Sequence, residues 1–122
     1  MRVLVVDDDE DNVEVLVMCL TAFLDWDVRA VTDGREALEI CWSTEFDVVV
    51  LDVEMPLMDG PHVLAALRAD PRTTSLPVVF LTANAEPALG DRLQALGALA
   101  VLAKPFDTWL IGEQLAEFLG GR

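Results

Sequence analysis

The chain has 122 residues, of which 22 are acidic and 8 are lysine or arginine, giving a formal charge of −14. This length is enough for one domain with a single core, and so acidic a domain disfavours direct binding to DNA or RNA, which carry charge of the same sign. No apolar run is long enough to cross a bilayer and no signal-peptide pattern is present, so we expect a cytoplasmic protein.

Short apolar runs alternate with amphipathic stretches five times along the chain. Strands are expected near residues 2–6, 27–31, 47–51, 77–81 and 99–102. Helices are expected near residues 10–24, 34–44, 62–69, 87–96 and 108–119, with Asp33, Gly60 and Asp107 as N-caps. The repeated strand–helix unit predicts right-handed crossovers and a parallel, doubly wound α/β sheet, with the alternating run 27–31 at an edge.

Four of the apolar runs lead to residues suited to phosphoryl chemistry. Residues 3–6 precede three aspartates at 7–9, residues 48–51 precede Asp52, and residues 78–81 precede Thr82. The last strand precedes Lys104, the only lysine in the sequence. Because the carboxyl ends of parallel strands meet at one edge, these groups are expected in one crevice, where open α/β sheets bind their ligands.

Asp52 is the candidate nucleophile of this crevice. The alternative is a turn acid or helix cap, but Pro56 and Asp59-Gly60 already supply the turn that follows. Several carboxylates at strand tips require a neutralising cation, and oxygen-only ligands favour Mg²⁺ or Mn²⁺. A carboxylate beside such a cation can attack phosphorus and form an aspartyl phosphate. Asp9 either caps the first helix or adjoins the metal, and capping is the favoured interpretation.

Four sequence blocks, VLVVDDDEDN, LDVEMPLMDG, FLTAN and AKPF, occur in this order. Together they resemble the receiver domains of two-component response regulators, of the chemotaxis-regulator type, over essentially the whole chain. The resemblance implies a flavodoxin-like (βα)5 fold with strand order 2-1-3-4-5. It also implies a single receiver domain over residues 1–122, with 120–122 as either a natural end or a linker stub.

The resemblance assigns a role to each residue of the crevice. Asp52 would accept a phosphoryl group from a histidine kinase or phosphotransfer protein. Asp8, Asp52 and the backbone carbonyl of Glu54 would bind Mg²⁺ directly, and Asp7 would bind it through water. The chain would then act as a switch that contacts a downstream protein or a second copy of itself, without being an enzyme toward outside substrates.

Lys104 and Thr82 also make chemical sense without the resemblance. An ammonium neutralises a phosphoryl oxygen and a hydroxyl donates a hydrogen bond to another. The alternatives are a surface lysine extended into solvent and a β-branched strand residue. The resemblance further implies a cis proline at Pro105, and it implies that Glu54 and Asn84 tune the rate of hydrolysis.

The sequence departs from the family at Val101, where receiver domains usually carry an aromatic residue that moves together with the threonine at position 82. This leaves open a receiver-like interaction module with an uncoupled switch. A phosphatase or phosphotransferase with an aspartyl intermediate is a further alternative, but it usually has an aspartate where Glu54 stands, and a cap domain. A flavodoxin-like electron carrier is disfavoured because the aspartate-rich crevice repels a flavin phosphate.

Apolar residues on the outer faces of two helices predict partner surfaces. The first helix turns Val15, Met18 and Ala22 away from its core stripe, which includes Phe23 and Leu24. The last helix places Trp109 and Leu110 where polar residues are expected, and with Val101 they predict an output or self-association surface.

Overall fold

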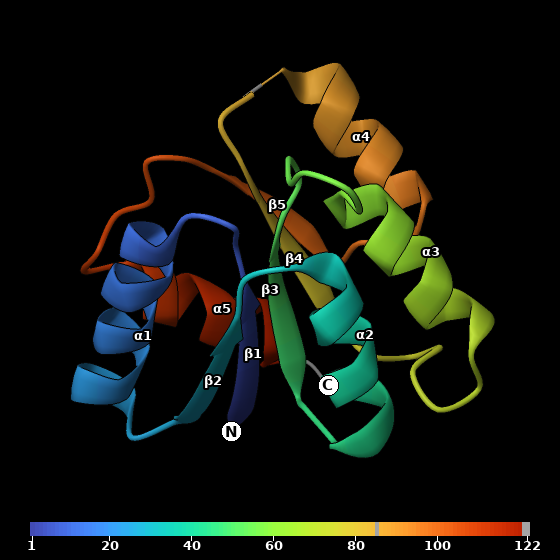
Figure 1. The fold of residues 1–122 in the computed structure, drawn as a ribbon. Helices are drawn as coiled ribbons and strands as arrows, with labels where there is room; N and C mark the ends of the chain where they lie inside the picture. The colour runs from blue at the N-terminus through green and yellow to red at the C-terminus, as the bar shows by residue number, and fades with distance from the viewer. Residues whose placement is uncertain (85, 121–122) are drawn as a thin grey trace.

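A parallel five-stranded sheet forms the centre of the computed structural model, which describes residues 1–84 and 86–120 (Figure 1). The strand order is β2-β1-β3-β4-β5, which confirms the predicted topology. The strands are β1 (Arg2–Val6), β2 (Asp27–Val31), β3 (Val48–Asp52), β4 (Val78–Thr82) and β5 (Ala100–Ala103). The helices are α1 (Glu10–Leu24), α2 (Gly34–Ser43), α3 (Gly60–Ala69), α4 (Pro87–Ala95) and α5 (Ile111–Leu119).

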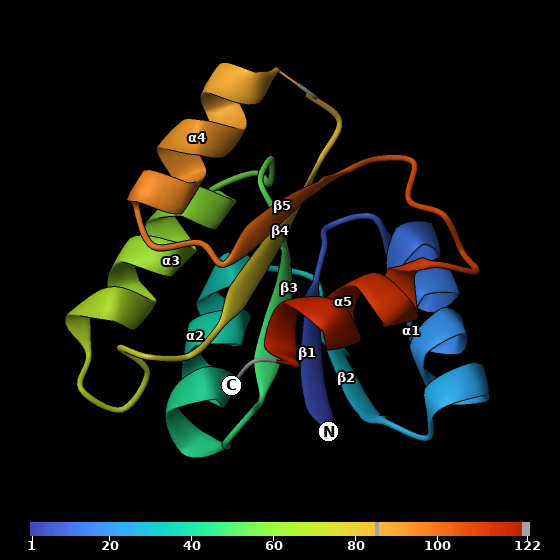
Figure 2. The ribbon, with the colours of Figure 1, turned by 180° about the vertical axis from the view of Figure 1, so that it is seen from behind.

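The helices form a layer on each face of the sheet. Figures 1 and 2 show α1 and α5 on one face and α2, α3 and α4 on the other. On the α1 side, Leu16, Leu20 and Leu115 pack against alternate residues of the strands, and on the other side Leu64 and Phe80 belong to a second cluster. Strands β3 and β4 are buried at every position, as their continuous apolar sequences predict for central strands.

Two of the predicted helix starts need correction. The N-cap of α3 is Asp59, whose side chain accepts a hydrogen bond from the His62 amide, so Gly60 is the first helical residue instead. Helix α5 begins at Ile111, because the Asp107 carboxylate accepts hydrogen bonds from the amides of Trp109 and Leu110 and caps a turn that precedes the helix. The first error reflects a choice between neighbouring residues that are both acceptable at a helix start, and the second reflects the capped turn that precedes α5.

Several smaller predictions concern the surface and the chain ends. Cys19 is half-buried and Cys41 is buried, and both are free thiols. None of the helices in the described part of the chain has the length and apolarity needed to cross a membrane. The side chains of Phe23 and Leu24, and residues 121–122 of the predicted tail, lie outside the described part of the structure.

Candidate functional site

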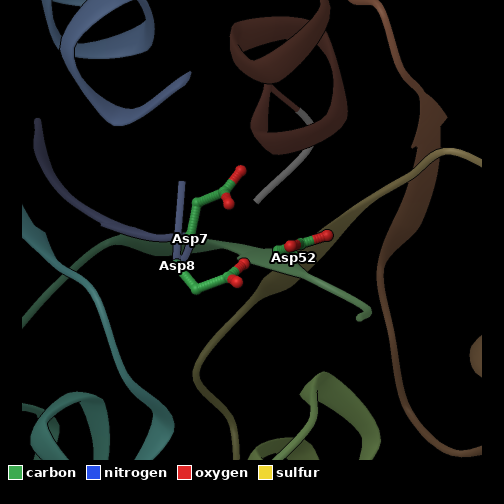
Figure 3. A group of neighbouring side chains, drawn as sticks. All are labelled: Asp7, Asp8 and Asp52. Atoms are coloured by element: carbon green, nitrogen blue, oxygen red, sulfur yellow. The ribbon is translucent and has the colours of Figure 1, made fainter. Parts of the chain in front are cut away.

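Three aspartates gather at the carboxyl ends of β1 and β3 (Figure 3). The parallel pairing of Val6 with Leu51 places the two strand ends level with each other. Carboxylate oxygens of Asp7, Asp8 and Asp52 all lie within 4.8 Å of one another. Asp7 and Asp52 are buried, at 2% and 5% exposure, whereas Asp8 is exposed. Buried acids directly after apolar strands are therefore assembled into one cluster, as the sequence predicts.

Gly60 lets α3 begin directly against the end of β3. A Cβ atom at this position would lie 2.5 Å from the backbone oxygen of Asp52 and 2.6 Å from Cε1 of Phe80. The Gly60 amide also donates to the carbonyl of Val53 at 2.9 Å. Any side chain here would push the helix away from the strand that carries Asp52.

The loop after β1 is shaped by its own aspartates. Asp7 Oδ1 accepts a hydrogen bond from the Asp9 amide at 2.9 Å. Asp9 Oδ1 in turn accepts from the amides of Asp11 and Asn12, so Asp9 is the N-cap of α1. The capping interpretation of Asp9 is confirmed.

Lys104 joins β5 to the acid cluster. Its Nζ lies 3.0 Å from Asp7 Oδ2 and 3.1 Å from Asp52 Oδ1, and the side chain is largely buried. The interpretation of Lys104 as a surface lysine is therefore wrong. The Lys104–Pro105 peptide bond is cis, as the resemblance implied.

Thr82 ends β4 as a buried residue, level with Ala103 of β5. Its Oγ1 accepts a hydrogen bond from the Asn84 amide at 3.0 Å, and Asn84 Oδ1 accepts from the Glu86 amide at 3.1 Å. Because the hydroxyl accepts this bond with a lone pair, its proton stays available for donation.

The acid cluster opens into a hollow of about 250 Å³, which we call the acid hollow. Its lining consists of Asp7, Asp8, Asp9, Asn12, Asp52, Glu54, Ala83 and Lys104. The predicted residues Thr82 and Asn84 do not line the acid hollow. Val101 is half-buried and packs against the core on the side of α2, α3 and α4. The sequence reasoning missed Asn12 and Ala83. Both residues could have been found from their positions in the sequence. Asn12 lies in the first turn of α1, shortly after the aspartates, and Ala83 directly follows Thr82.

Burial and mutual repulsion dominate the electrostatics of the acid hollow. Burial, followed by the charge of Asp7, raises the pKa of Asp52 to about 6, against the opposing hydrogen bonds from Lys104 and the Glu54 amide. Burial by itself lowers the pKa of Lys104, but its hydrogen bonds and ion pairs with Asp7 and Asp52 outweigh that effect and raise it. Three carboxylates face one ammonium, so the donor set has oxygen ligands and excess negative charge, which suits a hard divalent cation.

Comparison with known proteins places the site in a family. Residues 3–116 match the model of the response regulator receiver domain. The chain is a receiver domain. It is 36% identical over 106 residues to a probable chemotaxis protein CheY of Rhizobium etli, covering 87% of this chain and 82% of that protein. The response regulator PleD of Caulobacter vibrioides is 44% identical over 108 residues, covering 87% of this chain.

Solved structures agree with this assignment. The receiver domain of the sensor histidine kinase PA1611 from Pseudomonas aeruginosa PAO1 superposes with a TM-score of 0.86 at 30% identity. The match covers 98% of this receiver domain and 97% of the other, which has a magnesium ion coordinated in its active site cleft. The receiver domain spans only 23% of the length of PleD, so the relative contains much more than the matched part.

Proposed function

We propose that Asp52 accepts a phosphoryl group from a histidine kinase or phosphotransfer protein and that the modified domain changes its contacts with a downstream protein or a second copy. Receiver domains are signalling switches that interact with such donors and targets. The observation that carries the proposal is the buried Asp52 carboxylate, held 3.1 Å from Lys104 at the edge of the acid hollow.

The two oxygens of Asp52 have different surroundings. Oδ1 lies near Lys104 Nζ and accepts a hydrogen bond from the Glu54 amide at 3.4 Å. We assign Oδ2 as the attacking oxygen, because Oδ1 is already engaged. The new bond joins this oxygen to phosphorus while the bond from phosphorus to the donor's imidazole nitrogen breaks, and the donor keeps that electron pair.

The acid cluster fits a divalent cation. Mg²⁺, or Mn²⁺, would be held by Asp8, Asp52 and the backbone carbonyl of Glu54, with Asp7 acting through water. Such an ion neutralises charge on the phosphoryl oxygens during transfer. The magnesium in the related PA1611 receiver domain supports this assignment.

The remaining side chains stabilise the product and set its lifetime. Lys104 exchanges its contact with Asp52 for a phosphoryl oxygen while Asp7 holds its other side. Thr82 donates its free hydroxyl proton to a second oxygen. Glu54 is exposed and Asn84 lies two residues after Thr82, and we assign both of them to the control of water access. We place this chemistry in the cytoplasm, with no direct contact to nucleic acid or membrane.

The decisive experiment is labelling with acetyl phosphate and Mg²⁺, followed by peptide mapping by mass spectrometry. We expect one added phosphoryl group on Asp52 and none in the Asp52→Asn variant, which preserves the side-chain volume. A label on another residue, or none on the folded wild-type protein, contradicts the proposal. Repeated turnover of a small phosphoester would favour the phosphatase alternative instead.

Val101 motivates a second candidate function, an interaction module whose contacts do not respond to phosphorylation. Valine has one stiff side-chain torsion and no ring to reposition. Trp109 and Leu110 are exposed at 76% and 46% just before α5, as an output surface requires. We expect a phosphate-mimicking fluoride complex to change the oligomeric state through this surface, and an unchanged state together with unchanged partner affinity would favour the uncoupled module.

A further inference from the structure

A hollow of about 690 Å³, which we call the tryptophan hollow, lies at the opposite end of the sheet from the acid hollow. The end of α2 with the loop that leads to β3, the start of β1, and the loop between α3 and β4 surround it (Figure 1). Strand β3 runs for five residues between the two hollows, which corresponds to about 15 Å. The lining of the tryptophan hollow includes Cys41, Trp42, Glu45, Phe46, Pro71 and Pro77.

The tryptophan hollow has an apolar centre and a polar rim. Cys41 is buried, Trp42, Phe46 and Pro77 are half-buried, and Glu45 is exposed. Burial raises the pKa of the Cys41 thiol to about 11, so this side chain stays protonated and acts as an apolar group. An apolar centre inside a polar rim is typical of a surface that binds another molecule.

Trp42 has a buried hydrogen-bond donor without an acceptor. Its Nε1 is buried, and none of the residues 1–84 and 86–120 accepts a hydrogen bond from it. The guanidinium of Arg72 lies 5.4 Å from the centroid of the indole ring and pairs with Asp70 at 2.7 Å. Arg72 is exposed, and an exposed ion pair contributes little, so this side chain can move aside at low cost. An acceptor that reaches Nε1 would satisfy a donor that is unfavourable when it is left alone.

The charges at the rim favour a basic partner. Arg2 and Arg72 each have an acidic partner already, Asp27 at 3.6 Å and Asp70 at 2.7 Å. Glu45 is exposed and forms no ion pair within the described part of the chain. On a chain with a formal charge of −14, this carboxylate attracts lysine or arginine and repels an acidic segment, including a second copy of the same chain.

We propose that the tryptophan hollow binds an extended, proline-rich segment of a partner protein, with lysine or arginine beside the prolines. A segment in the polyproline II conformation has no internal hydrogen bonds, so its backbone carbonyls are free to accept one from Trp42 Nε1. Its proline rings pack on the flat apolar side chains of Trp42, Phe46 and Pro71, and its basic side chain pairs with Glu45. A helix is disfavoured as the occupant, because the carbonyls in its interior already accept hydrogen bonds within the helix.

The position of the tryptophan hollow separates this contact from the chemistry of the acid hollow. A partner bound at the other end of the sheet holds the domain while Asp52 remains accessible to a phosphodonor. The proposal therefore does not rest on the proposed function, and acetyl phosphate should label Asp52 at the same rate with and without the bound segment.

The test uses three peptides of about 10 residues, which span about 30 Å when extended. The first has a run of prolines flanked by lysines, the second has alanines in place of the prolines, and the third has glutamates in place of the lysines. The chain has three tryptophans, so three indole N–H signals appear in the NMR spectrum, and Trp42→Phe identifies the signal of Trp42 by its loss. We expect the first peptide to shift this signal and to leave those of Trp26 and Trp109 in place. The other two peptides should bind at least fivefold more weakly.

Matched variants test the two contacts separately. Trp42→Phe keeps an aromatic ring but removes the N–H, and it should lower affinity for the first peptide roughly fivefold. Glu45→Gln should lower that affinity roughly threefold, whereas Glu86→Gln, at an exposed position after the carboxyl end of β4, should leave it unchanged. Circular dichroism checks that the variants fold, and the two glutamate variants still decide the question if Trp42→Phe does not.

Several outcomes would overturn the proposal. These are no binding of the first peptide, equal binding of the proline and alanine peptides, shifts confined to Trp26 or Trp109, and equal effects of the two glutamate variants. A Trp42 signal that shifts with protein concentration alone would show that a second copy occupies the hollow instead. Slower labelling of Asp52 in the presence of the first peptide would place the peptide at the acid hollow.

Discussion

Helices α3 and α4 each follow a strand that carries a site residue, yet they are attached very differently. Helix α3 has a side-chain cap from Asp59 and buries Val63, Leu64 and Leu67. Helix α4 has no side-chain cap hydrogen bond, and Leu93 is its buried residue. Strand β3, which carries Asp52, is thus followed by a firmly packed helix. Strand β4, which carries Thr82, is followed by a helix that few interactions hold in place.

The glycines of these two helices, Gly60 in α3 and Gly90 in α4, show the same contrast, and Gly60 provides the largest expected effect. Gly60→Ala places a methyl group against the Asp52 carbonyl and Phe80, and backbone atoms cannot yield as a flexible side chain can. We expect a loss of about 3 kcal/mol in the free energy of unfolding, together with slower labelling of Asp52. Urea unfolding measures the first effect and mass spectrometry the second. A loss below about 0.5 kcal/mol would show that α3 is not fixed against β3.

Burial of Asp52 near the start of α3 raises the free energy of its ionised form, so the stability of the domain depends on pH. The pKa of Asp52 is raised from 3.8 to about 6 by burial and by Asp7. A carboxyl whose folded pKa exceeds its unfolded pKa destabilises the fold once ionised, fully above about pH 6, and this penalty shrinks as the pH falls toward 4. Between pH 7.5 and 5, without divalent cations, the wild type should gain about 1.4 kcal/mol relative to Asp52→Asn.

Urea unfolding in the presence of a chelator measures this difference at each pH. The other acids titrate in both proteins, so their contribution cancels in the difference between the unfolding free energies of the wild type and Asp52→Asn. Parallel pH profiles for wild type and variant would show that the Asp52 carboxylate is not destabilised by its burial next to Asp7.

The sequence predicted the strands and most of the acid hollow because both depend on local pattern. Continuous apolar runs identify β3 and β4, and parallel topology then brings Asp7, Asp52 and Lys104 to one edge. The choice of Asp59 over Gly60 as a cap could not be predicted, because it depends on how closely α3 approaches β3. Asn12 and Ala83 lie near assigned residues in the sequence, but whether they reach the acid hollow depends on packing between segments far apart in sequence.

The capping residues of the two helices offer a smaller effect that tests the same contrast. Asp59→Ala removes the hydrogen bond to the His62 amide and should cost about 1 kcal/mol. Glu86→Ala at the N-cap of α4 removes no side-chain cap bond, so the change should stay within about 0.3 kcal/mol. Thermal unfolding of the two variants measures both values, and equal losses would mean that the two helix starts are equally secured.

Gly90, in the middle of α4, provides the smallest effect, and its sign is opposite. A Cβ atom there would meet nothing within 4 Å, and the residue is helical, so alanine fits without strain. Gly90→Ala should raise the free energy of unfolding by about 0.5 to 1 kcal/mol, because alanine loses less backbone entropy in a helix. Hydrogen exchange of the α4 amides should slow by a corresponding factor while the α3 amides stay unchanged. Slower exchange in both helices would mean that α4 opens only together with the rest of the domain. The two helices would then differ in their packing, but they would have the same local stability.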